Sequence, residues 1–195
     1  AQFITTKLIF GVNADPKNKE GFFMKSSRKD FAAKLKKIVH GKFKTKKLPR
    51  LEAIINNKKI TSLAINEFFI GTRKGYHASK YTIKVGKKME RQKSSGILIT
   101  TPAGSYAWAR ACGCRQLKLS SNSFQYVVRE PYELKVFSKY KLKSGIIDKK
   151  GKIEVRSEML DGVIVADSVG KEYGFKNGSK AVIRMSKKPL NVIWF

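Results

Sequence analysis

The second half of the chain consists of short apolar runs separated by turn residues, and this pattern limits the fold more than any other feature. After Leu117 the runs are FQYVV, ELKVF, IEVRS, GVIVAD, KEYGF, KAVIRM and NVIWF. Runs of this length that are rich in Val, Ile, Phe and Tyr are typical of β-strands. We therefore predict a mainly β fold in which two sheets pack as a two-layer sandwich.

Earlier segments predict strands and turns of the same kind. Segments 50–56 and 60–70 read as two strands joined by a tight polar turn, and segment 81–85 begins a hairpin that turns at Gly86. Asn177-Gly178 predicts a further hairpin between KEYGF and KAVIRM, because this pair favours the two-residue turn that joins antiparallel strands.

The N-terminal part of the chain has an α/β pattern instead. Segment 8–12 predicts a short buried strand. Apolar residues at helical spacing in segment 31–39 predict an amphipathic helix, which Ser26 or Ser27 could cap at its start and Gly41 at its end. We expect a short α/β remnant that leads into the β-rich domain.

The charge balance is strongly basic. The chain carries 42 Lys and Arg residues against 14 Asp and Glu, a formal net charge of +28. Such a charge attracts nucleic acids, nucleotides, polyphosphate or anionic lipid. The lysines are spread along the whole chain and greatly outnumber Arg, which is the better residue for bidentate reading of phosphate or base. We therefore expect a generally cationic surface rather than a dedicated nucleic-acid groove.

Two other bulk features exclude classes of protein. Apolar residues make up 42% of the chain, enough for a packed core, and no apolar run reaches the roughly 18 residues of a membrane span. Cys112 and Cys114 are too close together for a useful disulfide, and they lack nearby His partners for zinc. We expect two reduced cysteines packed near a helix, as suits cytoplasm or mitochondrial matrix.

The segment SSGILITTPAGSYAW, residues 94–108, has the pattern of a ligand-facing loop. A buried strand leads into a Pro-Ala-Gly-Ser turn that opens a helix. Gly104 would let a ligand approach the backbone, and N–H groups at the start of a helix can bind oxygen or phosphate. Hydroxyls and aromatic faces follow in the same segment, at Thr100, Thr101, Ser105, Tyr106 and Trp108. The competing interpretation is an ordinary strand–turn–helix whose aromatic rings fill the core.

Two further segments contain candidate binding residues. Asn66-Glu67 lies between apolar residues in LAINEFFIG, and burying this pair is costly unless each side chain finds partners. A diol such as a ribose could supply them, whereas the alternative is a strand end where both side chains reach water. Asn13 ends a predicted strand, where α/β folds place ligands, and Phe22 could line the same crevice or belong to the core.

Taken in order, GVNADP, EGFF, LAINEFFIG, SSGILITTPAGSYAW, REPY and VRSEMLDGVIVAD resemble the NAD kinase family over essentially the whole chain. The forms GVNADP, NEFFIG and KSSG are closer to its mitochondrial-type branch. The resemblance implies that residues 1–23 are a remnant of the N-terminal α/β nucleotide-binding domain. Residues 24–195 would then be the β-rich NAD-binding domain.

The resemblance also implies the site residues. In this family the Asn-Glu pair binds the ribose and adenine side of the dinucleotide, and the Thr-Pro-rich loop lines the same pocket. The implied NAD-binding residues are Asn66, Glu67, Thr101, Gly104, Ser105, Ala107, Trp108, Tyr106, Phe22 and Asn13. The chain departs from the family strings at Ala103, Tyr106 and Trp108, and Ser95 stands where many members have an Asp.

The family's Gly-Gly-Asp-Gly loop, which supplies the catalytic Asp, does not occur in these 195 residues. The segment AQFITTKL resembles the helix just after that loop, so we expect the loop to lie upstream and no catalytic residue to lie in this chain. Phosphoryl transfer depends mainly on positioning and charge stabilisation, so this chain alone is expected to be inactive. Neither Asp15 nor Asp167 is expected to replace the missing base, and Ser168 stands where the family usually has a Gly after that Asp.

The activity implied by the resemblance is phosphorylation of the adenosine ribose 2′-hydroxyl of NAD to give NADP, with ATP or polyphosphate as donor. It further implies a magnesium-type divalent cation bound chiefly through the donor phosphates, and a homo-oligomer. No membrane partner is expected, and nucleic acid is not an expected partner. The competing function is a basic, β-rich nucleic-acid-binding protein, which would need exposed aromatic side chains beside a basic stripe.

Overall fold

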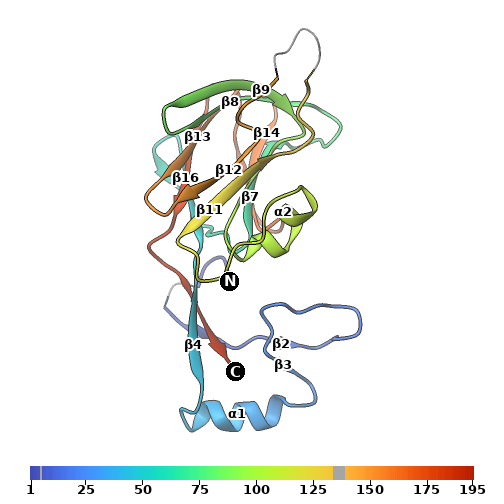
Figure 1. Ribbon diagram of the computed structural model, residues 1–195, viewed down its shortest axis with the longest axis vertical. Coiled ribbons are helices and arrows are strands. Elements are labelled where there is room, and N and C mark those ends of the chain that lie inside the picture. Colours follow the sequence, from blue (N-terminus) through green and yellow to red (C-terminus); the bar gives the residue numbers. More distant parts are fainter. Residues whose placement is uncertain (5, 134–138) are drawn as a thin grey trace. The chain divides into compact units, whose positions relative to one another are not determined.

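The computed structural model of the chain describes residues 1–4, 6–133 and 139–195 (Figure 1). These residues divide into two compact units. The first unit comprises residues 1–3 and 49–188, and the second comprises residues 4–48 and 189–195. The boundary expected after residue 23 falls inside the second unit, and it stays a prediction.

The first unit contains two six-stranded antiparallel sheets. The β7 sheet has the order β12 (Ser144–Asp148), β11 (Ser123–Val128), β10 (Ile97–Thr100), β7 (Glu67–Thr72), β14 (Gly162–Ala166) and β15 (Glu172–Gly174). The β8 sheet has the order β6 (Lys58–Lys59), β5 (Leu51–Ile55), β16 (Lys180–Met185), β13 (Lys152–Ser157), β8 (Ser79–Val85) and β9 (Lys88–Ser94).

One hydrophobic core lies between these two sheets. Alternate residues of both sheets point into it, as the two-residue period of a strand requires. The β7 sheet contributes Phe68, Ile70, Ile97, Ile99 and Phe124, and the β8 sheet contributes Tyr81, Ile83, Ile153, Val155 and Ile183. The predicted mainly β fold with a two-layer sandwich is confirmed.

A short helical segment covers the outer face of the β7 sheet. It consists of the 3-10 turn η1 (Gly104–Tyr106) and the single-turn helix α2 (Trp108–Ala111). Leu98 and Val127 of the sheet pack there against Ala109, and the half-buried Cys112 and Cys114 join this cluster as free thiols. Figure 1 shows α2 beside β7 and β11.

Two of the predicted hairpins are wrong, because the chain changes sheets where a hairpin was expected. The turn Asn56-Asn57 joins β5 only to the two-residue strand β6, and segment 60–66 then crosses to the other sheet before β7 begins. Leu63, Ala64 and Ile65 are buried in succession along this crossing, which a strand with one solvent face does not allow.

The second wrong hairpin is the one predicted at Asn177-Gly178. The turn itself forms, since the Ser179 N–H donates to the Lys176 carbonyl at 3.0 Å. However, β15 before it pairs with β14 in the β7 sheet, and β16 after it pairs with β13 and β5 in the β8 sheet. The predicted strand ELKVF lies, except for Glu133, outside the described residues.

The second unit is an α/β arrangement, as the sequence predicts. Its sheet has the order β1 (Leu8–Ile9), β17 (Leu190–Trp194) and β4 (Lys44–Leu48), and β2 (Val12–Asn13) pairs in parallel with β3 (Ser26–Ser27). The strand predicted over 8–12 is thus interrupted at Phe10 and Gly11.

The predicted helix forms as α1 (Phe31–Val39), and Gly41 follows its end with φ +69°. The predicted Ser caps are wrong because both serines lie in β3. Asp30 is the residue before the helix, and its Oδ1 accepts hydrogen bonds from Ser26 Oγ and the Ser27 N–H, both at 2.8 Å. Among the described residues, no helix has the length and apolar character needed to cross a membrane.

Candidate functional site

The loop after β10 is fastened to the residues that precede β7. Thr101 is fully buried, and its N–H donates to the Asn66 carbonyl at 2.8 Å while its hydroxyl donates to the Ile65 carbonyl at 2.5 Å. The same Thr101 oxygen accepts the Gly104 N–H at 3.0 Å. Two motifs that are 35 residues apart in sequence, by the numbers of Asn66 and Thr101, therefore form one rigid structure.

Gly104 lies at the closest approach between these segments. A Cβ built on Gly104 would be 2.1 Å from the Asn66 carbonyl oxygen and 2.3 Å from Thr100 Oγ1. No real side chain tolerates such distances, so this position accepts only glycine without a shift of the backbone. The close approach that the sequence assigned to a ligand is made here by the backbone of Asn66.

Asp167 fastens the same site from the end of β14. Its carboxylate accepts hydrogen bonds from the Asn66 N–H at 2.7 Å and the Ile65 N–H at 3.1 Å. Burial raises the pKa of Asp167, although these backbone N–H groups favour its charged form. The next residue, Ser168, donates its hydroxyl to Glu67 Oε1 at 3.1 Å. Both Asp167 and Ser168 have positive φ, 53° and 55°.

The site holds two buried oxygen atoms that lack a hydrogen-bond partner. Among the described residues, buried side-chain atoms without a partner are Asn66 Oδ1, Glu67 Oε2 and Arg129 Nε. Such atoms are costly, and their clustering on adjacent residues indicates a place for a ligand. Both oxygens are hydrogen-bond acceptors when Glu67 is ionised, so the fitting ligand donates at least two hydrogen bonds from neighbouring groups.

Glu67 is the group at this site that titrates near neutral pH. Burial and, to a smaller extent, the nearby charge of Asp167 together raise the pKa of its carboxyl to about 7, although the Ser168 hydrogen bond opposes both. Neighbouring carboxyl groups whose pKa values are both raised by burial are a recurrent feature of functional sites.

The protein is similar in sequence to several NAD kinases. It is 28% identical over 130 residues to an NAD kinase of Aeromonas salmonicida, which covers 65% of this chain and 43% of that protein. It is 21% identical over 178 residues to an NAD kinase of Thermoplasma volcanium, covering 90% of this chain and 62% of that protein. A probable NADH kinase of Oryza sativa subsp. japonica is 21% identical over 206 residues, covering 95% and 63%. No protein-family model matches the chain.

Solved structures of NAD and NADH kinases are similar to this chain in fold. The crystal structure of an NAD kinase from Archaeoglobus fulgidus in complex with ATP superposes with a TM-score of 0.77 at 24% identity, over 95% of this chain and 68% of that one. Yeast NADH kinase complexed with NADH superposes with a TM-score of 0.79 at 14% identity, over 97% and 62%. The fold is that of an NAD kinase. Two of the three sequence relatives named above are NAD kinases and the third is a probable NADH kinase, which supports the NAD kinase family. The chain spans 43% to 63% of the length of these three proteins.

Some of the residues implied by the NAD kinase resemblance hold the loop in place. Ser105 is fully buried, and its hydroxyl donates to the Pro102 carbonyl at 2.6 Å and accepts the Leu117 N–H at 2.9 Å. Ser105 and Thr101 therefore position the loop of this NAD kinase fold. Tyr106 is half-buried and Ala107 is exposed at the outer side of the same loop.

Trp108 packs on the sheet that carries Glu67. Its ring stacks on Phe69 with centroids 5.7 Å apart, and the Arg129 guanidinium lies 4.8 Å from the Trp108 centroid. Phe69 is two residues from Glu67 on β7, so both side chains are on the outer face of the β7 sheet. Trp108 is thus connected to the site through a single aromatic neighbour.

Asn13 and Phe22 belong to the second unit, whereas the other residues implied by the NAD kinase resemblance belong to the first. The Asn13 side chain closes its own loop, since Nδ2 donates to the Lys19 carbonyl at 2.7 Å and Oδ1 accepts the Asp15 N–H at 3.1 Å. Phe22 packs edge-on against Phe23 with ring centroids 5.1 Å apart. Their roles at a dinucleotide site stay predictions.

Two residues of the site were missed by sequence reasoning. Asp167 was considered only as a replacement base, and Ser168 only as a departure from the family pattern. The available signal was the run GVIVAD, whose last residue ends a strand and so lies at a sheet end. Asp167 lies next to Glu67 because β14 pairs with β7, and the run GVIVAD alone does not reveal that pairing.

Proposed function

We propose that this chain is the dinucleotide-binding part of an NAD kinase of the mitochondrial-type branch. The proposal is supported by the similarity to NAD and NADH kinases and by the cluster around Asn66, Glu67 and Asp167. The single observation that carries it is the pair of buried, unpartnered oxygens, Asn66 Oδ1 and Glu67 Oε2. An adenosine ribose, with adjacent hydroxyl donors, fits two neighbouring acceptors.

In this proposal each residue of the cluster has a distinct task. Asn66 and Glu67 accept hydrogen bonds from the dinucleotide, and Asp167 holds their backbone in place through the Asn66 and Ile65 N–H groups. Hydrogen bonds donated to Glu67 favour its charged form, so ligand binding offsets the burial that raises its pKa. Thr101, Gly104 and Ser105 keep the loop rigid beside the pocket.

The complete enzyme would transfer a phosphoryl group from ATP or polyphosphate to the 2′-hydroxyl of NAD, in the cytoplasm or mitochondrial matrix and as a homo-oligomer. The family's Gly-Gly-Asp-Gly loop would supply the base. Among the described residues no three His, Cys, Asp or Glu side chains gather into a metal site. We therefore assign no residue here to the magnesium-type cation, which donor phosphates would hold.

The test is titration calorimetry of NAD against the 195-residue chain and two Asn variants. Asn66→Ala should weaken NAD binding by about 1–3 kcal/mol, the scale of removing a partner from a buried polar contact. Asn177→Ala, which removes an exposed Asn at a distant turn, should leave the affinity unchanged. Equal affinities for Asn66→Ala and the unaltered chain would show that the pair does not hold the dinucleotide.

A further inference from the structure

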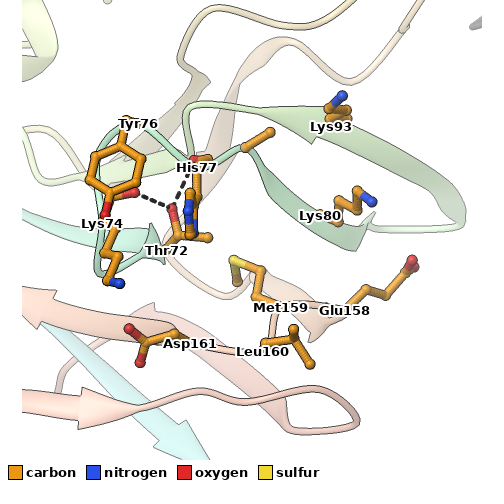
Figure 2. A pocket seen from close by; sticks show the side chains of 11 residues that line it. Thr72, Lys74, Tyr76, His77, Lys80, Lys93, Glu158, Met159, Leu160 and Asp161 are labelled. Atoms are coloured by element: carbon orange, nitrogen blue, oxygen red, sulfur yellow. Dashed lines mark hydrogen bonds between the residues drawn. The ribbon is translucent and has the colours of Figure 1, made fainter.

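A cavity on the first unit lies away from the Asn66–Glu67 cluster. It has a volume of about 510 Å³, and it is lined by the β7–β8 connection, the facing ends of β8 and β9, and the β13–β14 connection (Figure 2). Thr72 at its edge is five residues along β7 from Glu67, a separation of roughly 16 Å in a strand. We call it the lysine-lined cavity, after Lys74, Lys80 and Lys93.

The positive charges of this cavity are not cancelled by its own carboxylates. Glu158 is engaged by Arg91, whose Nε lies 2.7 Å from Oε2, and Asp161 is 3.6 Å from Arg73. Lys80 and Lys93 are directly opposite each other in the β8–β9 ladder. Like charges in that position repel each other, so this pair costs free energy that a bound anion would recover.

The rim of the cavity presents an aromatic ring on a fixed loop. Tyr76 is 79% exposed, and its ring meets His77 edge-on with centroids 4.6 Å apart. The Thr72 hydroxyl lies 3.0 Å from the Lys74 carbonyl oxygen and 2.9 Å from that of His77, so it donates its one proton to either of them, and Figure 2 shows both contacts beside the Tyr76 ring. The loop is therefore preorganised to hold an aromatic face in solvent.

A second aromatic ring and an apolar floor complete the surface. Lys93 Nζ lies 4.1 Å from the ring centroid of Tyr132, which is 40% exposed. Met159 is buried at the floor, whereas Leu160 beside it is 90% exposed. Cations that follow a phosphate chain, together with exposed rings on which bases stack, are the features that bind single-stranded nucleic acid without sequence preference.

We propose that the lysine-lined cavity is a second binding site, which takes single-stranded nucleic acid. Lys74, Lys80 and Lys93 contact phosphates, and Tyr76 stacks on a base. A second copy of the chain is a poor occupant of this particular cavity, because the cavity presents three lysines and the chain has only 14 Asp and Glu residues against 42 Lys and Arg to meet them. The site is independent of the proposed NAD pocket, since none of its lining residues belongs to that cluster.

The test is fluorescence anisotropy with a labelled, mixed-sequence single-stranded RNA of about 12 nucleotides, a length within the usual site sizes. The double variant Lys80→Gln/Lys93→Gln should weaken binding about tenfold. It should also reduce the slope of log Kd against log salt by about 1.4, because each single-strand phosphate contact contributes about 0.7. Tyr76→Ala should weaken binding about tenfold with the salt slope unchanged.

The matched control is Lys58→Gln/Lys88→Gln, which removes the same charge from exposed strand ends elsewhere on the β8 sheet. If both double variants weaken RNA binding equally, the effect is due to net charge alone and the proposal is overturned. The proposal is also overturned if AMP or an acidic peptide, at the same concentration of charge, displaces the RNA. Displacement by NAD would place the RNA in the dinucleotide pocket. Asn66→Ala should not change RNA binding, which keeps this result separate from the proposed NAD function.

Discussion

The two sheets of the first unit share one core, but one outer face is covered by a helical segment and the other is open to solvent. On the β7 sheet the outer face is covered by α2, and β10 is buried at every position. On the β8 sheet the outer face is open, β13 alternates between buried and more exposed residues, and Met89 is 70% exposed. The proposed dinucleotide site lies where the covered sheet ends, because there polar groups can be held away from water.

The same difference decides where charge accumulates. At the covered sheet Glu67 is buried and the neighbouring Asp167 is half-buried, and burial raises the pKa of each. On the open sheet the carboxylates of Glu154 and Glu158 are each engaged by Lys or Arg at the surface. Surface pairs of this kind contribute little stability, whereas a buried carboxyl strongly affects it.

The largest expected effect comes from removing a side chain between α2 and the covered sheet. Leu98 is fully buried in that small cluster, so Leu98→Ala should lower the free energy of unfolding by about 2–5 kcal/mol. Met89→Ala on the open sheet should change it by less than about 0.5 kcal/mol. Urea denaturation of both variants measures this, and similar costs for both would mean that α2 does not cover the β7 sheet.

The next effect depends on pH. The folded pKa of Glu67, about 7, lies above its unfolded value of about 4.5, so native protein binds more protons in that window and loses stability as pH rises through it. Glu67→Gln removes this penalty. At pH 4.5 the free energies of unfolding of Glu67→Gln and of the unaltered chain should be nearly equal. By pH 8 the free energy of unfolding of Glu67→Gln should exceed that of the unaltered chain by up to about 3 kcal/mol.

Glu20→Gln, at an exposed Glu for which no side-chain ion pair is found in the described chain, serves as the control for removing one negative charge. Urea denaturation at the two pH values gives both numbers. If the difference in free energy of unfolding between Glu67→Gln and the unaltered chain does not change with pH, the burial of an ionisable carboxyl at this position is contradicted.

The third effect concerns the close approach at Gly104. Gly104→Ala places a methyl group 2.1 Å from the Asn66 carbonyl oxygen, so the loop must shift at a cost of about 1–3 kcal/mol in stability. The shift should also weaken NAD binding. Gly174→Ala, whose Cβ would meet nothing within 4 Å, should change neither. Full NAD affinity in Gly104→Ala would show that the fastened loop does not shape the pocket.

The comparison of the two sheets also explains how much could be predicted from the sequence. The continuous run ILIT predicted a buried strand and the run IEVRS a β-strand, and β10 and β13 confirm both. The costly burial of Asn66-Glu67 pointed to the site. The choice of sheet for each strand was not predictable, since β15 and β16 have a strong hairpin turn between them and still separate. Asp167 and Ser168 were missed for the same reason, because strand partners far apart in sequence bring them to Glu67.

The smallest expected effect tests how far the covered face takes part in binding. Trp108 reaches the site through Phe69, so Trp108→Phe keeps an aromatic ring on Phe69 and should weaken NAD binding by only about 0.5 kcal/mol, at the low end for an aromatic pair. The emission of Trp108 should nevertheless change as NAD is added. Trp194→Phe removes the other tryptophan, which lies in the second unit, so that this signal can be assigned. A titration in which calorimetry records binding while Trp108 emission stays constant would assign Trp108 to packing of the β7 sheet alone.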